Sequence, residues 1–527
     1  MIKMKTMGCW RSLAAASLLL VVLSAVGMKQ AGASVHEYHN AKFTQIGNGY
    51  FLYGGMEGLR ASVPGKSGNG VANGKSFIRF DPSLKFTRTN ESASKVTMET
   101  AQITVEAIIF ELADKDNFGS SYVEGSQRNL CCTKELAKTQ RCKQGEVIIQ
   151  KDAENGDWPQ SRKASFTGNE ISIDFPTDTI PITKKGMYTL YFVFCEPELQ
   201  GLTLDGKTIW KNPGGYLPGK MTPLFVFYGI MSLAYLSLGL IWFVQYVRYW
   251  KEILQLQNCI TAVIALGMCE MATWYFDYVN FNATGKRPIG ITVWAVTFSA
   301  VKKTVSRLLI LVVSMGYGVV LPTLGGLTSK VILLGATYFV AAEVLDVVEN
   351  VGTINDASGN ARLFLVLPVA ILDAFFILWI FTSLSKTLEK LQARKRYAKL
   401  ELYRKFTNAL ALAVIIAVLW IGYELYFKAT DKFSERWESG WTISAFWIIF
   451  TFVLLIVICL LWAPSQNSTR FAYSEDVGED YDEEAVALTS SGAAAENEKN
   501  SVKTEQRKPV NTDVFSLDDD PEEDKRE

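Results

Sequence analysis

The sequence predicts a membrane protein with three parts: a luminal antiparallel β-sandwich, a seven-helix transmembrane bundle and a disordered acidic cytosolic tail. Two observations predict this fold class. Seven apolar stretches, each long enough to cross a bilayer, lie between residues 222 and 461 of the 527-residue chain. Before them lies a polar region of short alternating runs. We expect a signal peptide at 1–33, the sandwich at 34–220, the bundle at 221–463 and the tail at 464–527.

The first residues have the layout of a signal peptide. A basic segment with Lys3, Lys5 and Arg11 precedes a short apolar run from Leu13 to Val26, and Ala31-Gly32-Ala33 then fits a cleavage site. The alternative is a signal anchor, which would add an eighth helix, but the apolar run is short for that role. We therefore expect cleavage near the end of this small-residue triplet.

The polar region contains runs that alternate in polarity and end at Gly, Pro, Asn or Asp, as strands do. These runs are Gly49 to Gly55, Ser76 to Phe80, Gln102 to Leu112, Glu146 to Gln150, Glu170 to Phe175 and Met187 to Cys195. Asp205-Gly206 between Leu202 and Trp210 predicts a hairpin with a tight turn. Strands of this kind with turn-rich links favour an antiparallel β-sandwich.

Four cysteines in this region, Cys131, Cys132, Cys142 and Cys195, are enough for two disulfides. A bridge between the two adjacent cysteines would be strained, so two pairings with Cys142 and Cys195 remain open. Four free thiols would require a reducing compartment, which the signal peptide argues against.

Asn90-Glu91-Ser92 is a glycosylation acceptor, and Asn282 is a second candidate. His36 and His39 are the only histidines, and an i,i+3 pair with no Cys close by in the sequence and only Glu37 between them is a poor ligand set, so we expect no metal site.

The seven spans follow the polar region, and a helix needs about 20 residues to cross the hydrocarbon. They are Thr222 to Val247, Leu256 to Val279, Ile289 to Tyr317, Leu327 to Val348, Leu363 to Leu384, Phe406 to Phe427 and Trp441 to Leu461. Eight Lys and Arg between 386 and 405 predict that the link between spans five and six is cytosolic, which places the sandwich in the lumen and the tail in the cytosol. Five basic residues do not follow this rule, because the predicted topology places them on the luminal side: Lys286, Arg287, Lys428, Lys432 and Arg436.

Ionisable residues inside the spans are costly and therefore indicate function or specific packing. Counted by helical rise, Glu270, Glu343 and Glu424 lie nearer the lumen, whereas Lys302, Lys303, Arg307 and Asp373 lie deeper. One hypothesis is a polar cavity with the last three as its floor, suited to an anionic or zwitterionic ligand such as a lipid headgroup. The alternative is a set of interhelical ion pairs that fix packing; for Glu424, packing or solvation is favoured.

Four segments of the chain resemble the lung seven-transmembrane receptor-like family, also called Golgi-dynamics-domain seven-transmembrane proteins. They are Val301-Lys302-Lys303-Thr304-Val305-Ser306-Arg307 with its continuation to Gly325, Asn212 to Leu217, Leu400 to Asn408, and Trp462 to Ser474. The last two look most like the transmembrane protein 87 branch. The resemblance implies a Golgi-dynamics-like β-sandwich on the bundle, residence in the Golgi and post-Golgi system, and retrograde traffic from endosomes to the trans-Golgi network. It also implies a lipid-occupied cavity in the bundle.

Three classes of function compete. The first is a trafficking or cargo-escort factor, whose partners are membrane lipid, a luminal protein or cargo, and cytosolic trafficking machinery that binds the tail. The second is a seven-transmembrane signalling receptor, a candidate for G-protein coupling, and the third is an ion channel or lipid carrier. Lys+Arg and Asp+Glu balance at 53 each and no basic tract suits nucleic acid. We find no nucleophile–base cluster, so we expect no enzyme and no cofactor other than a bound phospholipid.

Overall fold

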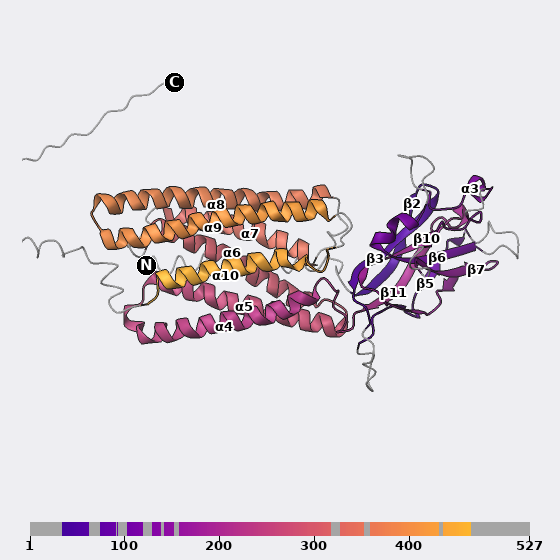
Figure 1. Cartoon of the computed structure of the whole chain (residues 1–527), viewed down its shortest axis with the longest axis horizontal. Coiled ribbons are helices and arrows are strands. Elements are labelled where there is room, and N and C mark those ends of the chain that lie inside the picture. The colour runs from indigo at the N-terminus through magenta and orange to yellow at the C-terminus, as the bar shows by residue number, and fades with distance from the viewer. Residues whose placement is uncertain are drawn as a thin grey trace, which may run out of the picture. The chain divides into compact units, whose positions relative to one another are not determined.

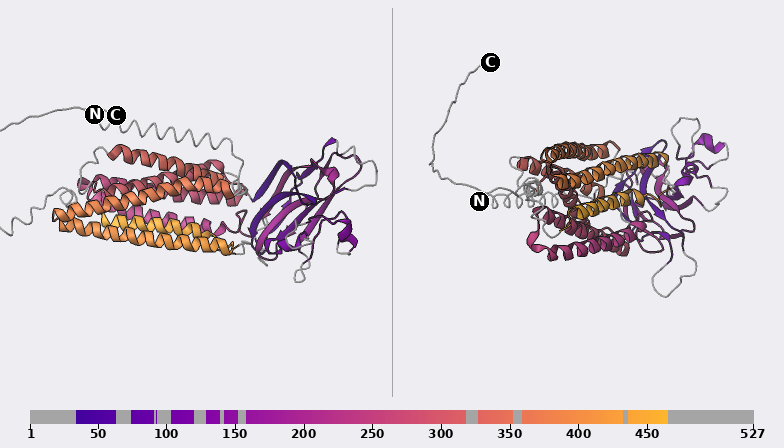
Figure 2. Two further views of the ribbon diagram at one scale, coloured as in Figure 1. Left: turned by 90° about the horizontal axis from the view of Figure 1, so that it is seen from above. Right: turned by 60° about the vertical axis from the view of Figure 1, so that its left-hand side comes forward.

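We describe a computed structural model of the chain (Figures 1 and 2). It describes residues 34–62, 74–90, 92, 103–119, 129–138, 142–151, 158–317, 327–351, 359–431 and 436–464. The predicted signal peptide and almost all of the predicted acidic tail lie outside these residues, and both stay predictions.

The N-terminal part is an antiparallel β-sandwich of two sheets, as the sequence predicts. One sheet has the order β8-β5-β11-β4-β9, with β1 paired to the other edge of β11, and the second has the order β2-β3-β10-β6-β7. The strands are β1 Val35–Lys42, β2 Thr44–Ile46, β3 Gly49–Leu59, β4 Phe77–Phe80, β5 Lys85–Thr87, β6 Ile103–Glu111, β7 Gln160–Phe166, β8 Ser172–Asp174, β9 Thr179–Pro181, β10 Gly186–Phe194 and β11 Thr203–Lys211.

Aromatic side chains from both sheets fill the space between them. Phe80 and Phe86 of the first sheet meet Phe192 of the second, with ring centres 6.5 and 5.7 Å apart. All three are fully buried, as is Trp210. Edge-to-face and tilted ring pairs of this kind add to the free energy gained by burying apolar area.

The predicted hairpin at Asp205-Gly206 is wrong, because both predicted arms belong to the single strand β11. Gly206 has φ +119°, and a Cβ there would lie 2.5 Å from the Cα of Leu84. The turn between β4 and β5 therefore passes directly over this glycine. Along one edge β11 pairs with β5 before Gly206 and with β4 after it. The glycine marks a change of neighbouring strand inside β11, not a turn.

The other strand predictions are confirmed in part. β3, β4, β6 and β10 lie where the alternation predicts them, and β8 forms over three residues of the predicted run. The run from Glu146 to Gln150 is not a strand, since only isolated bridges, such as that between Val147 and Cys131, form there. The alternation did not reveal β1, β2, β5, β7 and β9, which are short or mostly polar.

Both predicted disulfides form, in one of the two pairings that the sequence leaves open. Cys131 bonds to Cys195 and Cys132 bonds to Cys142. The first bond ties β10 to the segment that covers the outer face of its sheet, where Phe110, Phe118 and Val193 form a second small core.

Seven long helices follow the sandwich in the described residues. They are α4 Thr222–Arg248, α5 Gln255–Thr284, α6 Ile289–Ser314, α7 Leu327–Val351, α8 Gly359–Ala393, α9 Tyr397–Thr430 and α10 Trp441–Leu461. Six of them are long and apolar enough to cross a membrane; α6 is less apolar, because it carries Lys302, Lys303 and Arg307. Short helices are η1 Leu112–Asn117, α3 Lys134–Lys138, η2 Pro197–Leu199 and η3 Trp250–Glu252.

The basic segment after the fifth span is mostly helical, not the loop we expected. α8 runs to Ala393 and α9 starts at Tyr397, so only three residues connect them, and Lys395 among these has φ +51°. Both helices extend beyond their apolar stretches because charged residues with good helix propensity continue them.

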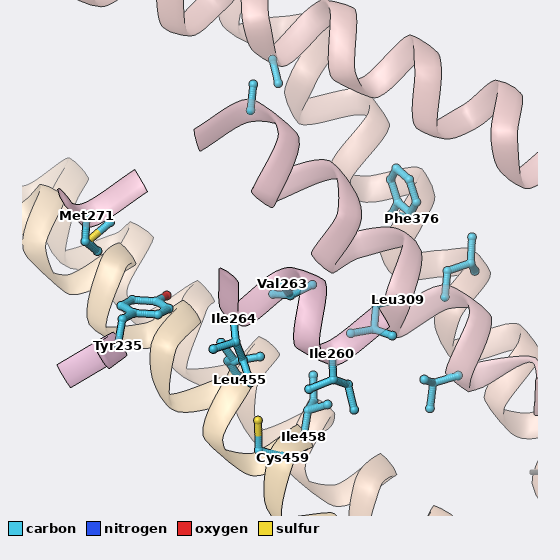
Figure 3. Packing of buried hydrophobic residues seen from close by; sticks show 14 of the residues in the cluster. Tyr235, Ile260, Val263, Ile264, Met271, Leu309, Phe376, Leu455, Ile458 and Cys459 are labelled. Atoms are coloured by element: carbon cyan, nitrogen blue, oxygen red, sulfur yellow. The ribbon is translucent and has the colours of Figure 1, made fainter. Parts of the chain in front are cut away.

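The bundle core combines side chains from several helices. Figure 3 shows Tyr235 from α4, Ile260 and Ile264 from α5, Leu309 from α6 and Leu455 from α10, all members of one buried cluster. This packing brings α4 and α10 together although most of the bundle separates them in the sequence. Around this core, α6 packs against α5, α7 and α8.

Candidate functional site: charged residues inside the bundle

The charged residues of α6 reach three different helices. Lys302 pairs with Glu270 of α5, Lys303 with Asp346 of α7, and Arg307 with Asp373 of α8. Successive helical residues are rotated by 100°, so the neighbours Lys302 and Lys303 point toward different partner helices. Lys303 and Arg307 are four residues apart and share a side of α6.

Lys302 and Glu270 form the most deeply buried of these pairs. Nζ lies 2.6 Å from Oε2, and less than a tenth of either side chain is exposed. Nζ is also 5.0 Å from the ring centre of Tyr235, which gives the ammonium a second favourable contact. The ring has room because residue 267 is glycine, where a Cβ would lie 2.2 Å from it.

The two other cations of α6 are less enclosed. Nζ of Lys303 lies 2.6 Å from Oδ2 of Asp346, and 41% of the lysine side chain is exposed. Arg307 donates two hydrogen bonds to Asp373, Nε to Oδ1 at 2.5 Å and Nη2 to Oδ2 at 3.1 Å. Its guanidinium lies over the ring of Tyr338. This two-point contact fixes the rotation of α8 against α6.

Glu343 of α7 lies in the same region without an ion pair among the described residues. Its Oε1 is 2.9 Å from the hydroxyl of Thr297 on α6, and its Oε2 is buried with no hydrogen-bond partner. Only 6% of the residue is exposed.

A fourth ion pair joins α5 to the start of α6, and our sequence reasoning missed it. Asp277 is fully buried, with Oδ2 3.1 Å from Nε of Arg287 and Oδ1 2.5 Å from the hydroxyl of Thr292. The signal in the sequence was the position of Arg287, on the side where the positive-inside rule disfavours Lys and Arg. Asp346 was also missed, although it lies within a predicted span.

The structure thus places the predicted residues as follows. It joins Lys302 to Glu270 and Arg307 to Asp373, and gives Lys303 a partner that we did not predict. Glu424 stands apart, in a partly exposed i,i+4 pair with Lys428. The arrangement has the form of interhelical ion pairs; a polar cavity stays a hypothesis.

A cavity of about 490 Å³ lies elsewhere, between α7 and α8. It is lined by Ala336, Thr337, Val340, Ala341, Val344, Phe364, Leu365 and Pro368. None of the predicted cavity residues is among them, and only one lining residue is polar. This surface suits hydrocarbon and offers no charge to a headgroup.

Several contacts join the sandwich to the ends of the helices. The amide of Val35 donates to the carbonyl of Gly285, and Glu37 forms an ion pair with Lys286. Trp437, between α9 and α10, packs against Gly58 and Gly219, where a Cβ would lie 2.7 Å from its ring. The two glycines therefore let the indole lie between β3 and the link into α4.

The two candidate glycosylation sites differ in their surroundings. Asn90 is exposed. The side chain of Asn282 is half-buried, accepts from the amide of Leu217 and donates to the carbonyl of Gly214. His36 and His39 are three residues apart on β1 and point to opposite faces, an arrangement that does not bring them to one ion.

Comparison with known proteins finds a family model that matches the helical part of the chain. Residues 223–469, which contain nearly all of α4 and the whole of α5 to α10, match the family model "GOST, seven transmembrane domain". The chain is therefore a multi-pass membrane protein with a GOST seven-transmembrane domain.

Within this class, proteins named Transmembrane protein 87 are among the relatives that the chain is similar to. It is similar to Transmembrane protein 87B of Mus musculus, with 35% identity over 333 residues, or 62% of this chain and 59% of the relative. It is also similar to Transmembrane protein 87A of Xenopus tropicalis, with 36% identity over 274 residues, or 52% of this chain and 50% of the relative. Membrane protein PTM1 of Saccharomyces cerevisiae (strain YJM789) is 25% identical over 336 residues, 60% of this chain and 61% of that protein. The chain thus spans about half to three-fifths of the length of these relatives.

Proposed function

We propose that the protein resides in Golgi and post-Golgi membranes and escorts cargo in retrograde transport from endosomes to the trans-Golgi network. In this proposal the sandwich lies in the lumen and binds cargo, and the tail engages trafficking machinery in the cytosol. The signal-peptide pattern, the two disulfides and the basic segment where α8 ends and α9 begins support this orientation. We propose no catalytic role.

The contacts between sandwich and helices are the observation that carries this proposal. The sandwich is attached through the backbone at Gly285, through the Glu37–Lys286 ion pair and through the indole of Trp437. A further ion pair joins Lys185 to Glu438. A ligand held by a sandwich attached at several points moves with the bundle, as cargo escort requires.

The test replaces Trp437 by alanine in cells that lack the endogenous protein. Loss of the indole should loosen the sandwich without unfolding it, so a retrograde cargo should accumulate in endosomes. Trp250→Ala, which removes an exposed indole, is the matched control. Normal recycling in cells without the protein would contradict the proposal. If recycling is normal, two further measurements separate the alternatives. Activation of a G protein by the intact chain would support a signalling receptor. Ionic current across liposomes that contain the purified chain would support a channel.

We also propose that a phospholipid binds with an acyl chain in the cavity between α7 and α8. The lining is apolar and the volume, about 490 Å³, accommodates part of such a chain. Val340→Trp would fill this cavity, so phospholipid extracted with the purified protein should decrease. Leu460→Trp on the exposed face of α10 is the control. Equal phospholipid content in both variants and the unaltered chain would contradict this site.

A further inference from the structure

Glu343 differs from the other buried carboxyl groups of the bundle in lacking a cation. Lys302, Lys303 and Arg307 of α6 and Arg287, just before this helix, each form an ion pair with a carboxylate. Their partners are Glu270, Asp346, Asp373 and Asp277. Glu343 is a fifth carboxyl group, 94% buried, for which this part of the chain supplies no ion pair. An ionised carboxylate in such a place would carry an uncompensated charge away from water.

The hydrogen-bond partners of Glu343 also favour its neutral form. The hydroxyl of Thr297 lies 2.9 Å from Oε1 of Glu343 and 2.9 Å from the carbonyl oxygen of Val293. A hydroxyl has one hydrogen to donate. If Glu343 is ionised, it receives at most this single hydrogen, and its buried Oε2 keeps a share of the charge with no donor.

A protonated Glu343 removes this conflict. Its own O–H then donates to Oγ1 of Thr297, and the threonine hydrogen goes to the carbonyl of Val293. The remaining carboxyl oxygen is uncharged, and leaving it without a donor costs much less than leaving a charged oxygen without one.

We propose that Glu343 is a proton-binding site of the bundle, occupied at neutral pH, with Thr297 as its hydrogen-bond acceptor. The charged groups around it are Lys303 on α6 and Asp346 on α7. The other helix packed against α7 is α8, whose Asp373 is bound by Arg307. Loss of the proton would place two carboxylates, three residues apart on α7, near the single ammonium of Lys303. Proton occupancy therefore controls the ion pairing between α6 and α7.

The first experiment compares heat resistance of the purified full chain with Glu343→Gln and Glu270→Gln. A glutamine amide donates to Thr297 as a carboxylic acid does, so Glu343→Gln should keep the same folded fraction after heating. Glu270→Gln leaves the ammonium of Lys302 buried without its carboxylate, so most of the folded fraction should be lost. A loss for Glu343→Gln as large as that for Glu270→Gln would show that Glu343 is ionised and would overturn the proposal.

The second experiment observes the proton directly in the unaltered chain. Infrared spectra at neutral pH should contain a carbonyl stretch of a protonated carboxyl group, and Glu343→Gln should abolish it. Raising the pH of the unaltered chain should remove the same band. If the neutral-pH spectra of the two proteins show no difference in this band, Glu343 does not hold a proton and the proposal fails.

Discussion

In the β-sandwich most buried side chains are aromatic or aliphatic and most charged groups lie at the surface, whereas the helical bundle also exposes large apolar side chains and encloses several charged ones between its helices. Leu233, Leu378 and Leu460 on the bundle are each about two-thirds or more exposed, at 66%, 69% and 74%. Lys302 and Glu270 are enclosed between its helices. The difference follows from the solvent of each part, because hydrocarbon accepts apolar surface and rejects charge.

This comparison shows what determines geometry in each part. In the sandwich, register and aromatic packing position the strands. In the bundle, lipid resembles the core in polarity, so apolar packing alone discriminates weakly between helix rotations. Ion pairs from α6 to α5, α7 and α8 accept only one rotation of each helix, and we expect them to determine which faces meet.

The largest expected effect comes from breaking the buried pair in the bundle. Lys302→Met leaves the carboxylate of Glu270 without its cation, and removing one partner of a buried pair costs about 3–5 kcal/mol. The double variant Lys302→Met/Glu270→Leu removes both charges and should recover most of the stability. Thermal unfolding of the purified variants measures the loss in the single variant and the recovery in the double variant. Equal losses in the single and double variants would mean that the side-chain volumes matter, not the charges.

The next effect concerns the disulfides of the sandwich, whose described residues form no ion pair as deeply buried as Lys302–Glu270. Cys131–Cys195 closes a sequence separation of 64 residues and Cys132–Cys142 one of 10. By loop-closure entropy, breaking the first should cost about 4 kcal/mol and breaking the second about 3 kcal/mol. Thermal unfolding of two variants, each with both cysteines of one disulfide replaced by serine, tests which bond contributes more stability. A larger loss at the shorter loop would show that local packing outweighs chain entropy.

Glu57 is an exception to the distribution of charge in the sandwich. Burial raises the pKa of its carboxyl group above the ordinary value, against opposing hydrogen bonds from His36 and Ser34. A raised folded-state pKa stabilises the fold fully below the unfolded value of 4.5, and this stabilisation is lost as pH rises through the folded value.

Glu57→Gln should therefore flatten the pH profile of unfolding, with an effect of about 1 kcal/mol, the scale of one net hydrogen bond. The exposed Glu135→Gln on α3 is the control. Unfolding temperatures measured across the acidic range test this, and parallel profiles for the unaltered chain and Glu57→Gln would contradict it.

The sequence predicts more of the bundle than of the sandwich. A span is defined by some twenty consecutive apolar residues, so all seven helices were located. The strands β2, β5 and β9 each have three residues, too few for alternation to distinguish them from loops. Gly206 was misassigned because the sequence does not show that the β4–β5 turn passes over it.

For the charged site, the sequence indicates depth but not rotation. Lys302, Lys303, Arg307 and Asp373 were selected by their position along the spans. Pairing depends on how each helix is rotated about its axis, which one sequence does not determine when apolar residues surround the helix. This is why Asp346, the partner of Lys303, was missed and Glu424 was grouped with residues that it does not contact.

Glu424 is the exception in the bundle, and its removal should have the smallest effect. Its carboxylate lies 2.6 Å from Nζ of Lys428 one turn later on α9, and more than half of the lysine side chain is exposed. Partly exposed pairs at this spacing contribute about 0.3–0.5 kcal/mol. Glu424→Gln should therefore change the unfolding temperature very little, and added salt should reduce the difference further. A loss comparable to that of Lys302→Met would show that Glu424 is enclosed in the membrane and belongs with the interior charges after all.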